Sequence, residues 1–240
     1  MRTLLDRMVA QPHPLFGGNM KKTLIALVAL GLVGTAAQAQ TPTWSGFKAG
    51  LSLGSLNYTN TWTDTAYDWY GGSLSYPKRK IAPSIHVGWD TQMGSVVYGA
   101  ELDYTFASAK RTEIYDTPIG NSVRVTKSDE LKSVTTLRGR MGMTVGNALV
   151  YATAGIAKVK TDHTWTETGD PNDSWPTFHN DHTGFVYGFG VEHRVSDLLS
   201  LRAEYQHVNV PETSSTNNKG YTMEVGEDVS TFAFGASFHF

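Results

Sequence analysis

The chain has 240 residues, of which 40% are hydrophobic and 18% are charged. It contains no cysteine, so a disulfide framework and a cysteine-ligated metal site are excluded. The formal net charge of −2 gives no sign of a nucleic-acid-binding protein. No run of about eighteen or more apolar residues occurs, which excludes a membrane protein built from helices but leaves a membrane β-barrel open.

The N-terminal segment has the features of an export signal. Lys21 and Lys22 precede an apolar stretch over 24–33, and Ala37 and Ala39 are the small residues that a signal peptidase reads. We expect three parts along the chain: an upstream leader that is disordered or a mis-assigned start (1–19), a secretory signal peptide (20–39) and an outer-membrane β-barrel domain (40–240).

Removal of this signal changes the charge balance. Residues 1–39 contain four bases (Arg2, Arg7, Lys21 and Lys22) and one acid (Asp6), so 20 − 4 leaves 16 Lys and Arg against 22 − 1, or 21, Asp and Glu. The exported chain therefore has a net charge near −5. It must become periplasmic, secreted or part of an outer membrane.

The rest of the sequence alternates with a period of two and shows no helical periodicity. Strands are predicted at 44–54, 81–91, 95–107, 131–145, 148–160, 183–195, 199–210 and 229–240. The connections between them alternate between long and short, and the long ones are about 55–80, 108–130, 161–182 and 211–228. This alternation predicts an all-β fold, an eight-stranded antiparallel up-and-down transmembrane β-barrel with short periplasmic turns and four long extracellular loops.

The direction in which side chains face supports a membrane barrel. Phe232, Phe234 and Phe238 share one face of the last predicted strand, while Ser237 and His239 share the other. The third, fourth, sixth and seventh strands likewise place apolar residues opposite charged ones, whereas 149–160 is too uniformly apolar to orient. An apolar outside with a polar inside is the inverse of a soluble core. We expect aromatic girdles from Trp44, Trp89, Tyr98, Tyr104, Tyr151 and Tyr205.

Several strand motifs carry a family resemblance. They are Trp44-Ser45-Gly46-Phe47, 98–104 (YGAELDY), 137–142 (LRGRMG), 151–155 (YATAG), 188–192 (GFGVE), 201–205 (LRAEY) and the terminal Phe240. Together they resemble the small opacity-type, porin-like outer-membrane β-barrel proteins of Gram-negative bacteria, which are distantly similar to the barrel of outer-membrane protein A. The resemblance implies an eight-stranded barrel in the cell outer membrane, and it implies that Phe240 is an insertion signal read by the outer-membrane insertion machinery. It implies no single activity.

Charged side chains on the inward faces form the first candidate site. They are Glu101, Asp103, Arg138, Arg140, Glu192, Arg194, Arg202 and Glu204. Each acidic pair has a basic pair within cross-strand reach, so these charges predict a lumen filled by ion pairs. A gate that opens by exchange of these pairs is the alternative interpretation.

Basic residues near the long connections form the second candidate site, at one rim of the barrel. We expect a glycolipid-contacting rim made by Lys78, Arg79, Lys80, Lys110, Arg111, Lys158 and Lys160. Outer-leaflet glycolipid carries phosphates that such residues attract, although loop solubility explains the same pattern.

The remaining candidates carry weaker signals. Ser237 and His239 match a lipid-modifying active site poorly, so we expect no enzyme and no catalytic residues. The loop residues His163, Asp170, Asp173, His179, Asp181 and His182 have a spacing that is common by chance, so no metal and no cofactor are expected. Loop aromatics include Trp62, Trp69, Trp165 and Trp175, on which a surface-recognition role would depend.

These observations favour a monomeric outer-membrane barrel with a structural or surface-recognition role and with its loops as the contact surface. Its expected partners are the outer membrane with its glycolipid, the insertion machinery, and host or matrix molecules that bind the loops. The alternatives are a small or gated porin that conducts ions through a charged lumen and, with less support, a glycolipid-modifying enzyme.

Overall fold

The computed structural model describes residues 43–64, 74–116, 124–168, 178–216 and 222–240. The expected leader and signal peptide lie outside these ranges. Within the described part of the chain, no helix is long and apolar enough to cross a membrane.

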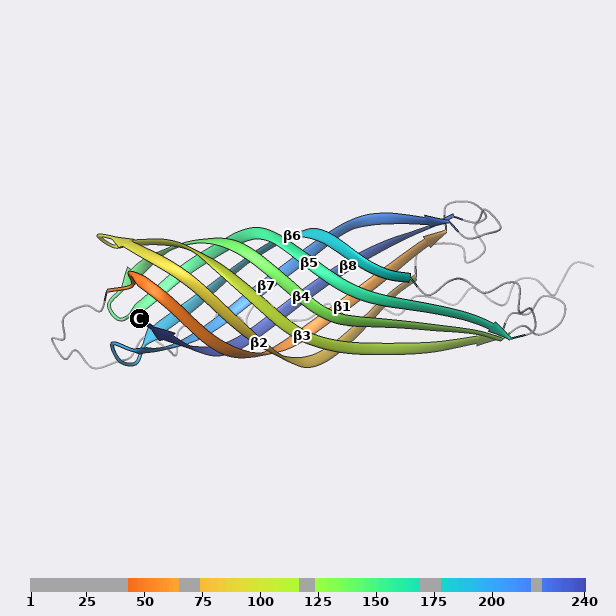
Figure 1. Cartoon of the computed structure of the whole chain (residues 1–240), viewed down its shortest axis with the longest axis horizontal. Coiled ribbons are helices and arrows are strands. Elements are labelled where there is room, and N and C mark those ends of the chain that lie inside the picture. The colour runs from red at the N-terminus through yellow and green to blue at the C-terminus, as the bar shows by residue number, and fades with distance from the viewer. Residues whose placement is uncertain (1–42, 65–73, 117–123, 169–177, 217–221) are drawn as a thin grey trace, which may run out of the picture. The chain divides into compact units, whose positions relative to one another are not determined.

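Eight antiparallel strands form one closed barrel in the order of the sequence (Figure 1). Its strands are β1 (Gly46–Asp64), β2 (Leu74–Met93), β3 (Val96–Asp116), β4 (Arg124–Val145), β5 (Ala148–Thr168), β6 (Phe178–Arg194), β7 (Leu199–Thr216) and β8 (Thr222–His239). The ring closes where β1 pairs with β8, from Lys48 opposite His239 to Asp64 opposite Met223. The predicted fold class is therefore confirmed.

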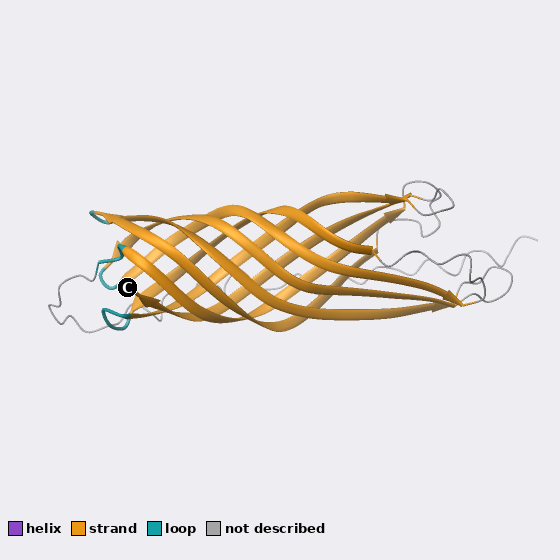
Figure 2. Cartoon of the chain, viewed as in Figure 1, coloured by secondary structure: helices purple, strands orange, loops and turns teal. Residues whose placement is uncertain are grey.

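The connections between strands alternate in length, as predicted. Residues 94–95, 146–147 and 195–198 make the tight turns, which lie at the same end as the C-terminus (Figure 2). Gly94 and Gly146 have φ of 61° and 59°, and glycine adopts this left-handed conformation without steric cost. We call the opposite end the long-connection end.

The strands are longer than the sequence predicted. The predicted ranges have 11 to 15 residues, but the strands have 17 to 22, and the extra residues lie mainly toward the long-connection end. β3 continues past 107 to Asp116, which pairs with Arg124 of β4. The prediction ended these strands where their apolar alternation stops. Backbone pairing does not depend on apolar side chains, so the hairpins continue as polar ribbons.

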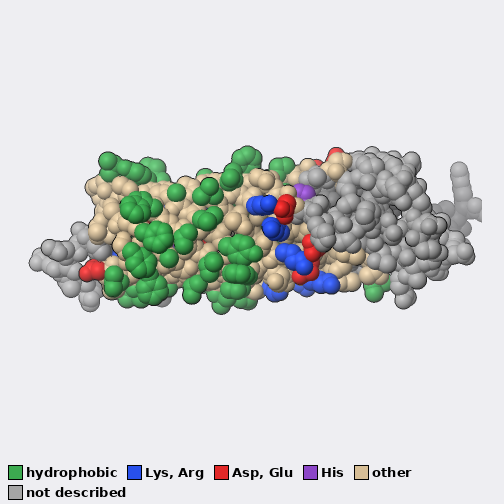
Figure 3. All heavy atoms as spheres, in the orientation of Figure 1, with side chains coloured by type: hydrophobic (Ala, Val, Ile, Leu, Met, Phe, Trp, Pro, Cys, Tyr) green, Lys and Arg blue, Asp and Glu red, His purple; other side chains and the backbone are tan. Residues whose placement is uncertain are grey.

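Large apolar side chains face outward around the tight-turn half of the barrel (Figure 3). This apolar band consists of Leu51, Leu53, Ile81, Ile85, Val87, Trp89, Leu102, Tyr104, Phe106, Leu137, Met141, Met143, Val150, Ile156, Phe185, Tyr187, Phe189, Leu201, Phe232, Phe234 and Phe238. The predicted outward faces of the third, fourth, sixth, seventh and last strands all contribute to it. Such a continuous exposed apolar surface suits contact with lipid.

Two of the six expected girdle aromatics point inward instead. Trp44 is only 1% exposed and Tyr151 only 2%. The Tyr151 hydroxyl donates a hydrogen bond to Glu204 Oε2 at 2.7 Å, so the lumen supplies the acceptor that its polar end needs. Gly190 leaves room for this ring, since a Cβ there would lie 2.6 Å from the Tyr151 hydroxyl. Trp89, Tyr98 and Tyr104 are exposed, and Tyr205 is half-buried.

The interior is layered rather than polar throughout, as the inward residues of β1 illustrate. Lys48 and Ser52 lie at polar levels, Leu56 and Tyr58 at an apolar level, and Asn60 at a second polar level. We define the apolar layer as Leu56, Tyr58, Ala82, Ala107, Ala109, Leu131, Val134, Ala157, Val159, Val186, Val208, Val210 and Val229. The lumen is therefore polar on both sides of an apolar layer, whereas the prediction made it polar throughout.

If the apolar band contacts lipid, an ion placed on it will be costly. Met141 faces outward near the middle of the band, and we expect Met141→Arg to lower the free energy of unfolding by about 2–4 kcal/mol. Thr183→Arg, beside the exposed Lys158, should change it by less than about 0.5 kcal/mol. Urea unfolding from lipid vesicles measures both values. Equal small effects would mean that the band is not in hydrocarbon.

Candidate functional site

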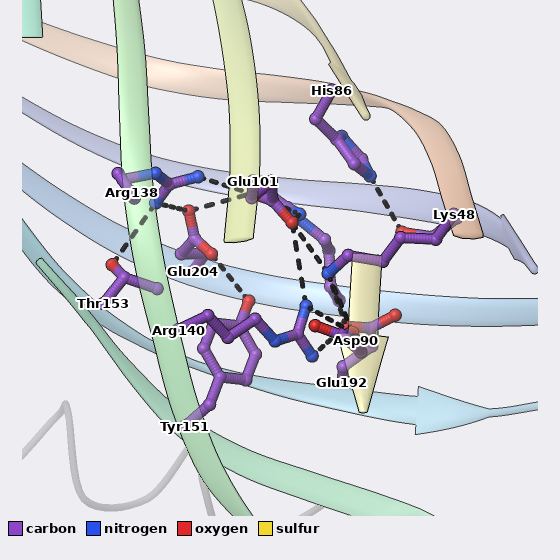
Figure 4. A network of polar contacts seen from close by, with 12 residues as sticks. Lys48, His86, Asp90, Glu101, Arg138, Arg140, Tyr151, Thr153, Glu192 and Glu204 are labelled. Atoms are coloured by element: carbon purple, nitrogen blue, oxygen red, sulfur yellow. Dashed lines mark hydrogen bonds and ion pairs between the residues drawn. The ribbon is translucent and has the colours of Figure 1, made fainter. Parts of the chain in front are cut away.

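The lumen contains a connected set of buried ions, centred on Glu101 of β3 (Figure 4). Its carboxylate accepts hydrogen bonds from Arg138 at 2.6 Å and from Arg202 at 2.9 Å, and it lies 2.8 Å from Lys48 Nζ. Arg138 also donates to Glu204 Oε1 at 2.7 Å. Arg140 Nη1 lies 3.7 Å from the same carboxylate, so one buried carboxylate contacts four cations.

A second centre lies closer to the tight turns. Arg140 donates to Glu192 Oε2 at 2.6 Å, and its other terminal nitrogen is 3.7 Å from Asp90. Lys48 links the two centres, at 3.4 Å from Asp90 and 2.8 Å from Glu101. We define the inner ion network as four cations and four carboxylates, Lys48, Arg138, Arg140, Arg202, Asp90, Glu101, Glu192 and Glu204. Its formal charges balance.

The ion pairs cross the lumen as well as joining neighbouring strands. Glu101 and Arg138 are direct neighbours in the β3–β4 ladder and do pair. Glu192 lies opposite Arg202 in the β6–β7 ladder, yet its close partner is Arg140 of β4. The bonds therefore link distant strands of the ring through its interior.

Two of the predicted cluster residues lie outside this network. Asp103 accepts a hydrogen bond from Thr105 at 3.1 Å and forms no ion pair in the part of the chain that the structure describes. Arg194 donates to the backbone carbonyls of Asp197 and Thr43, at 2.6 and 2.7 Å. Its guanidinium also stacks 5.0 Å from the ring centroid of Trp44, so this residue closes the tight-turn end.

Sequence reasoning missed Lys48 and Asp90 as members of the network. The signal was present in both strands. Lys48 lies between outward Phe47 and Ala49, and Asp90 follows Trp89 on a strand with regular alternation. Alternation alone places both charges inside the barrel.

Ser237 and His239 do not form a catalytic pair. Ser237 Oγ is 2.8 Å from His86 Nε2, while His239 Nε2 lies 2.8 Å from Ser200 Oγ and 3.2 Å from Glu192 Oε1. Ser200 and Glu192 therefore both contact Nε2 of His239. In a catalytic triad the imidazole instead bridges its two partners, one at each ring nitrogen. These residues satisfy one another as part of the lumen packing.

The expected basic rim lies just beyond the apolar band. Figure 3 shows basic and acidic side chains gathered at its border. Lys158 forms an exposed ion pair with Asp181 at 2.7 Å, and Lys132 forms exposed pairs with Asp162 and Glu130 at 3.0 and 3.2 Å. Part of the basic charge at this level is therefore matched by carboxylates.

The other candidates can be placed only in part. Of the loop histidines and acids considered as metal ligands, the side chains of Asp181 and His182 are described and the other four are not. The described residues contain no group of three metal-ligating side chains. The loop tryptophans also lie outside the described side chains. Phe240 follows β8. The residue is 77% exposed, and the centroid of its ring lies 6.0 Å from that of Phe47.

A closed up-and-down barrel with an outward apolar band and an ion-filled interior defines a membrane-spanning β-barrel protein. The model of the family described as "Outer membrane protein beta-barrel domain" matches residues 25–240, and this chain belongs to that family. It is a protein of the cell outer membrane. The tight turns are therefore periplasmic and the long connections extracellular.

Curated relatives agree with this assignment. A 22 kDa outer membrane protein of Rhizobium leguminosarum bv. viciae is 25% identical over 185 residues, covering 76% of this chain and 69% of the relative. A 25 kDa outer-membrane immunogenic protein of Brucella melitensis is 25% identical over 201 residues, covering 82% and 79%. The solved structure of OprG from Pseudomonas aeruginosa is 10% identical, covers 85% of this chain and 100% of that chain, and superposes with a TM-score of 0.49.

The geometry predicts unequal effects for two neighbouring carboxylates. Glu101→Gln removes a charge that contacts four buried cations, and we expect it to lower the free energy of unfolding by about 3–5 kcal/mol. Asp103→Asn, at the next inward position, removes a charge without a cationic partner in the described chain and should be neutral or stabilising. Urea unfolding of the two variants gives the comparison. Similar losses in both would contradict the network described above.

Proposed function

We propose that this protein is a non-enzymatic, non-conducting barrel with a structural or surface-recognition role in the cell envelope. In this proposal the periplasmic half anchors the chain in the outer membrane. The extracellular ribbons and their loops are the surface that meets partners.

The filled lumen is the observation that carries the proposal. At the level of Glu101 the inner ion network joins β1, β2, β3, β4, β6 and β7 through the interior. The apolar layer lies beyond it and includes the fully buried Leu56 and Leu131. An eight-stranded barrel has an interior just wide enough for its own side chains. An ion would have to displace the network and then cross the apolar layer, which is costly.

The length of the strands supports a role at the cell surface. β3 extends over 107–116 beyond Phe106, the last aromatic of the apolar band on this strand. At about 3.3 Å a residue and a tilt of roughly 40°, this part rises roughly 25 Å. The hairpins thus carry their loops well above the hydrocarbon.

The partners in this proposal are the outer membrane and its glycolipid, the insertion machinery that reads Phe240, and host or matrix molecules at the loops. The barrel is proposed to act as a monomer. The relatives named as immunogenic outer-membrane proteins are consistent with a surface that is exposed outside the cell.

Single-channel recording on the refolded protein tests the proposal against the gated-porin alternative. We expect no steady unitary conductance from the wild-type barrel in a planar bilayer, because the ion network and the apolar layer block the path in series. An open porin recorded in the same bilayer is the positive control. A steady wild-type conductance that changes in Arg138→Ala or Arg140→Ala would overturn the proposal in favour of transport.

A further inference from the structure

The barrel wall is interrupted at its extracellular end along the β2–β3 boundary. Pairing between these strands ends at Ser84 opposite Thr105. β2 nevertheless begins as early as Leu74, and β3 runs on to Asp116. Within the described ranges, the facing edges of 74–83 and 106–116 have no backbone ladder between them.

A second interruption lies on the opposite side of the ring. Pairing between β6 and β7 ends at Phe185 opposite Asn209, although β6 begins at Phe178 and β7 ends at Thr216. The other six boundaries stay paired further out, so the extracellular part divides into a β7-β8-β1-β2 sheet and a β3-β4-β5-β6 sheet. In Figure 1 the outer ends of β1, β7 and β8 lie apart from those of β3, β4 and β5.

Both interruptions have local causes in the sequence. Pro83 stands immediately beyond the last β2–β3 pair, and Pro211 stands beyond the last β6–β7 pair. Proline lacks the N–H that a ladder requires and is found at strand edges. A β-bulge lies between Phe106 and Ala109 of β3, and another between Val210 and Thr213 of β7. Bulges increase the local twist and turn a strand away from its neighbour.

The two open seams carry opposite charge. We define the basic seam as the β2–β3 interruption with its five flanking bases, Lys78, Arg79, Lys80, Lys110 and Arg111. The β6–β7 seam is flanked by the exposed acids Asp181 and Glu212. Its histidine His207 lies 3.6 Å from Asp228.

Two cations of the basic seam, Arg79 and Lys110, are available to a ligand. Arg79, Lys80 and Lys110 are exposed, and Lys78 and Arg111 are half-buried. Lys80 Nζ donates across the seam to the backbone carbonyl of Ser108, whose φ of 42° is left-handed. In the described part of the chain, neither Arg79 nor Lys110 forms an ion pair.

Two carboxylates of β4 lie beside the basic seam. Asp129 lies opposite Arg111 and Glu130 opposite Lys110 in the β3–β4 ladder. Asp129 is buried, and Glu130 contacts Lys132 at 3.2 Å. Arg79 and Lys110 therefore remain as the two exposed bases of the seam on which a ligand site would depend.

The basic seam opens at the border of the apolar band. Ile81 of β2 and Phe106 of β3 are the large apolar side chains that face outward beside it. On its periplasmic side, a ligand at this position contacts the hydrocarbon around the apolar band. On its extracellular side it contacts the cations and the unpaired backbone edges of β2 and β3. That combination matches an amphiphile with an anionic headgroup, because phosphate oxygens accept hydrogen bonds from Lys, Arg and backbone N–H groups.

We propose that the basic seam is a binding site for the phosphate groups of outer-leaflet glycolipid, whose acyl chains lie along the apolar band below it. The site narrows the expected basic rim to one boundary of the barrel. It excludes Lys158 and Lys160 of β5, of which Lys158 is held by Asp181. The site does not depend on whether the lumen conducts, so it and the proposed function can fail separately.

The test measures binding of fluorescent bisphosphorylated lipid A, in mixed detergent micelles, to the refolded full-length barrel. We expect Arg79→Gln combined with Lys110→Gln to weaken binding about tenfold, since both bases are exposed and flank the seam. Lys158→Gln combined with Lys160→Gln removes the same charge at the rim and should weaken it less than threefold. Heat-modifiable electrophoretic mobility shows that each variant is folded.

Two further probes separate the possible sources of the anion. The first probe is lipid A without its phosphates, which should bind the wild type as weakly as phosphorylated lipid A binds the seam variant. The second probe is millimolar inorganic phosphate, which should not displace bound lipid A from the wild type. Equal losses in the two double variants would overturn the site in favour of a diffuse rim. Binding that does not depend on the phosphates, or full displacement by inorganic phosphate, would overturn the glycolipid assignment.

Discussion

Closure of the backbone ladder between β1 and β8 is the constraint on which the structure depends. Hydrocarbon supplies no partner for an open strand edge, so a sheet within the membrane must pair every strand on both sides. The ladders of this barrel are continuous through most of the apolar band. They part at β2–β3 and β6–β7 at the extracellular border of that band, where Ile81 and Phe106 flank the first opening and water can satisfy the freed N–H and C=O groups.

Closure also determines the interior. Alternation along each strand must place one set of side chains in lipid, so charges can lie only in the lumen or above the membrane. Inside, each buried charge needs a partner, and Glu101 has four. The apolar layer around Leu56 needs none. Together the ion network and the apolar layer fill the lumen. A filled lumen favours a surface role for this membrane-anchored barrel over transport.

Much of this architecture follows from the sequence, because the direction in which a side chain points depends only on alternation along its strand. Alternation correctly places Phe234 on the lipid side and Glu101 in the lumen. Contacts across the lumen do not follow. The pairing of Arg140 with Glu192 depends on the stagger of the strands around the ring, which no local pattern encodes. Tyr151 was placed outward because its strand is apolar on both faces. The strand extensions and the open seams were missed because polar ribbons resemble loops in composition.

The central claim is that side chains alternate between lipid and a sealed lumen around a closed ring. The chain has no cysteine, so single cysteines can be introduced along β8 from Phe232 to Phe238 and labelled with bimane in vesicles that contain doxyl-labelled lipid. Positions 232, 234, 236 and 238 should be strongly quenched, and positions 233, 235 and 237 weakly. Quenching without a two-residue period, or a chain that stays monomeric in water without detergent, would contradict the account.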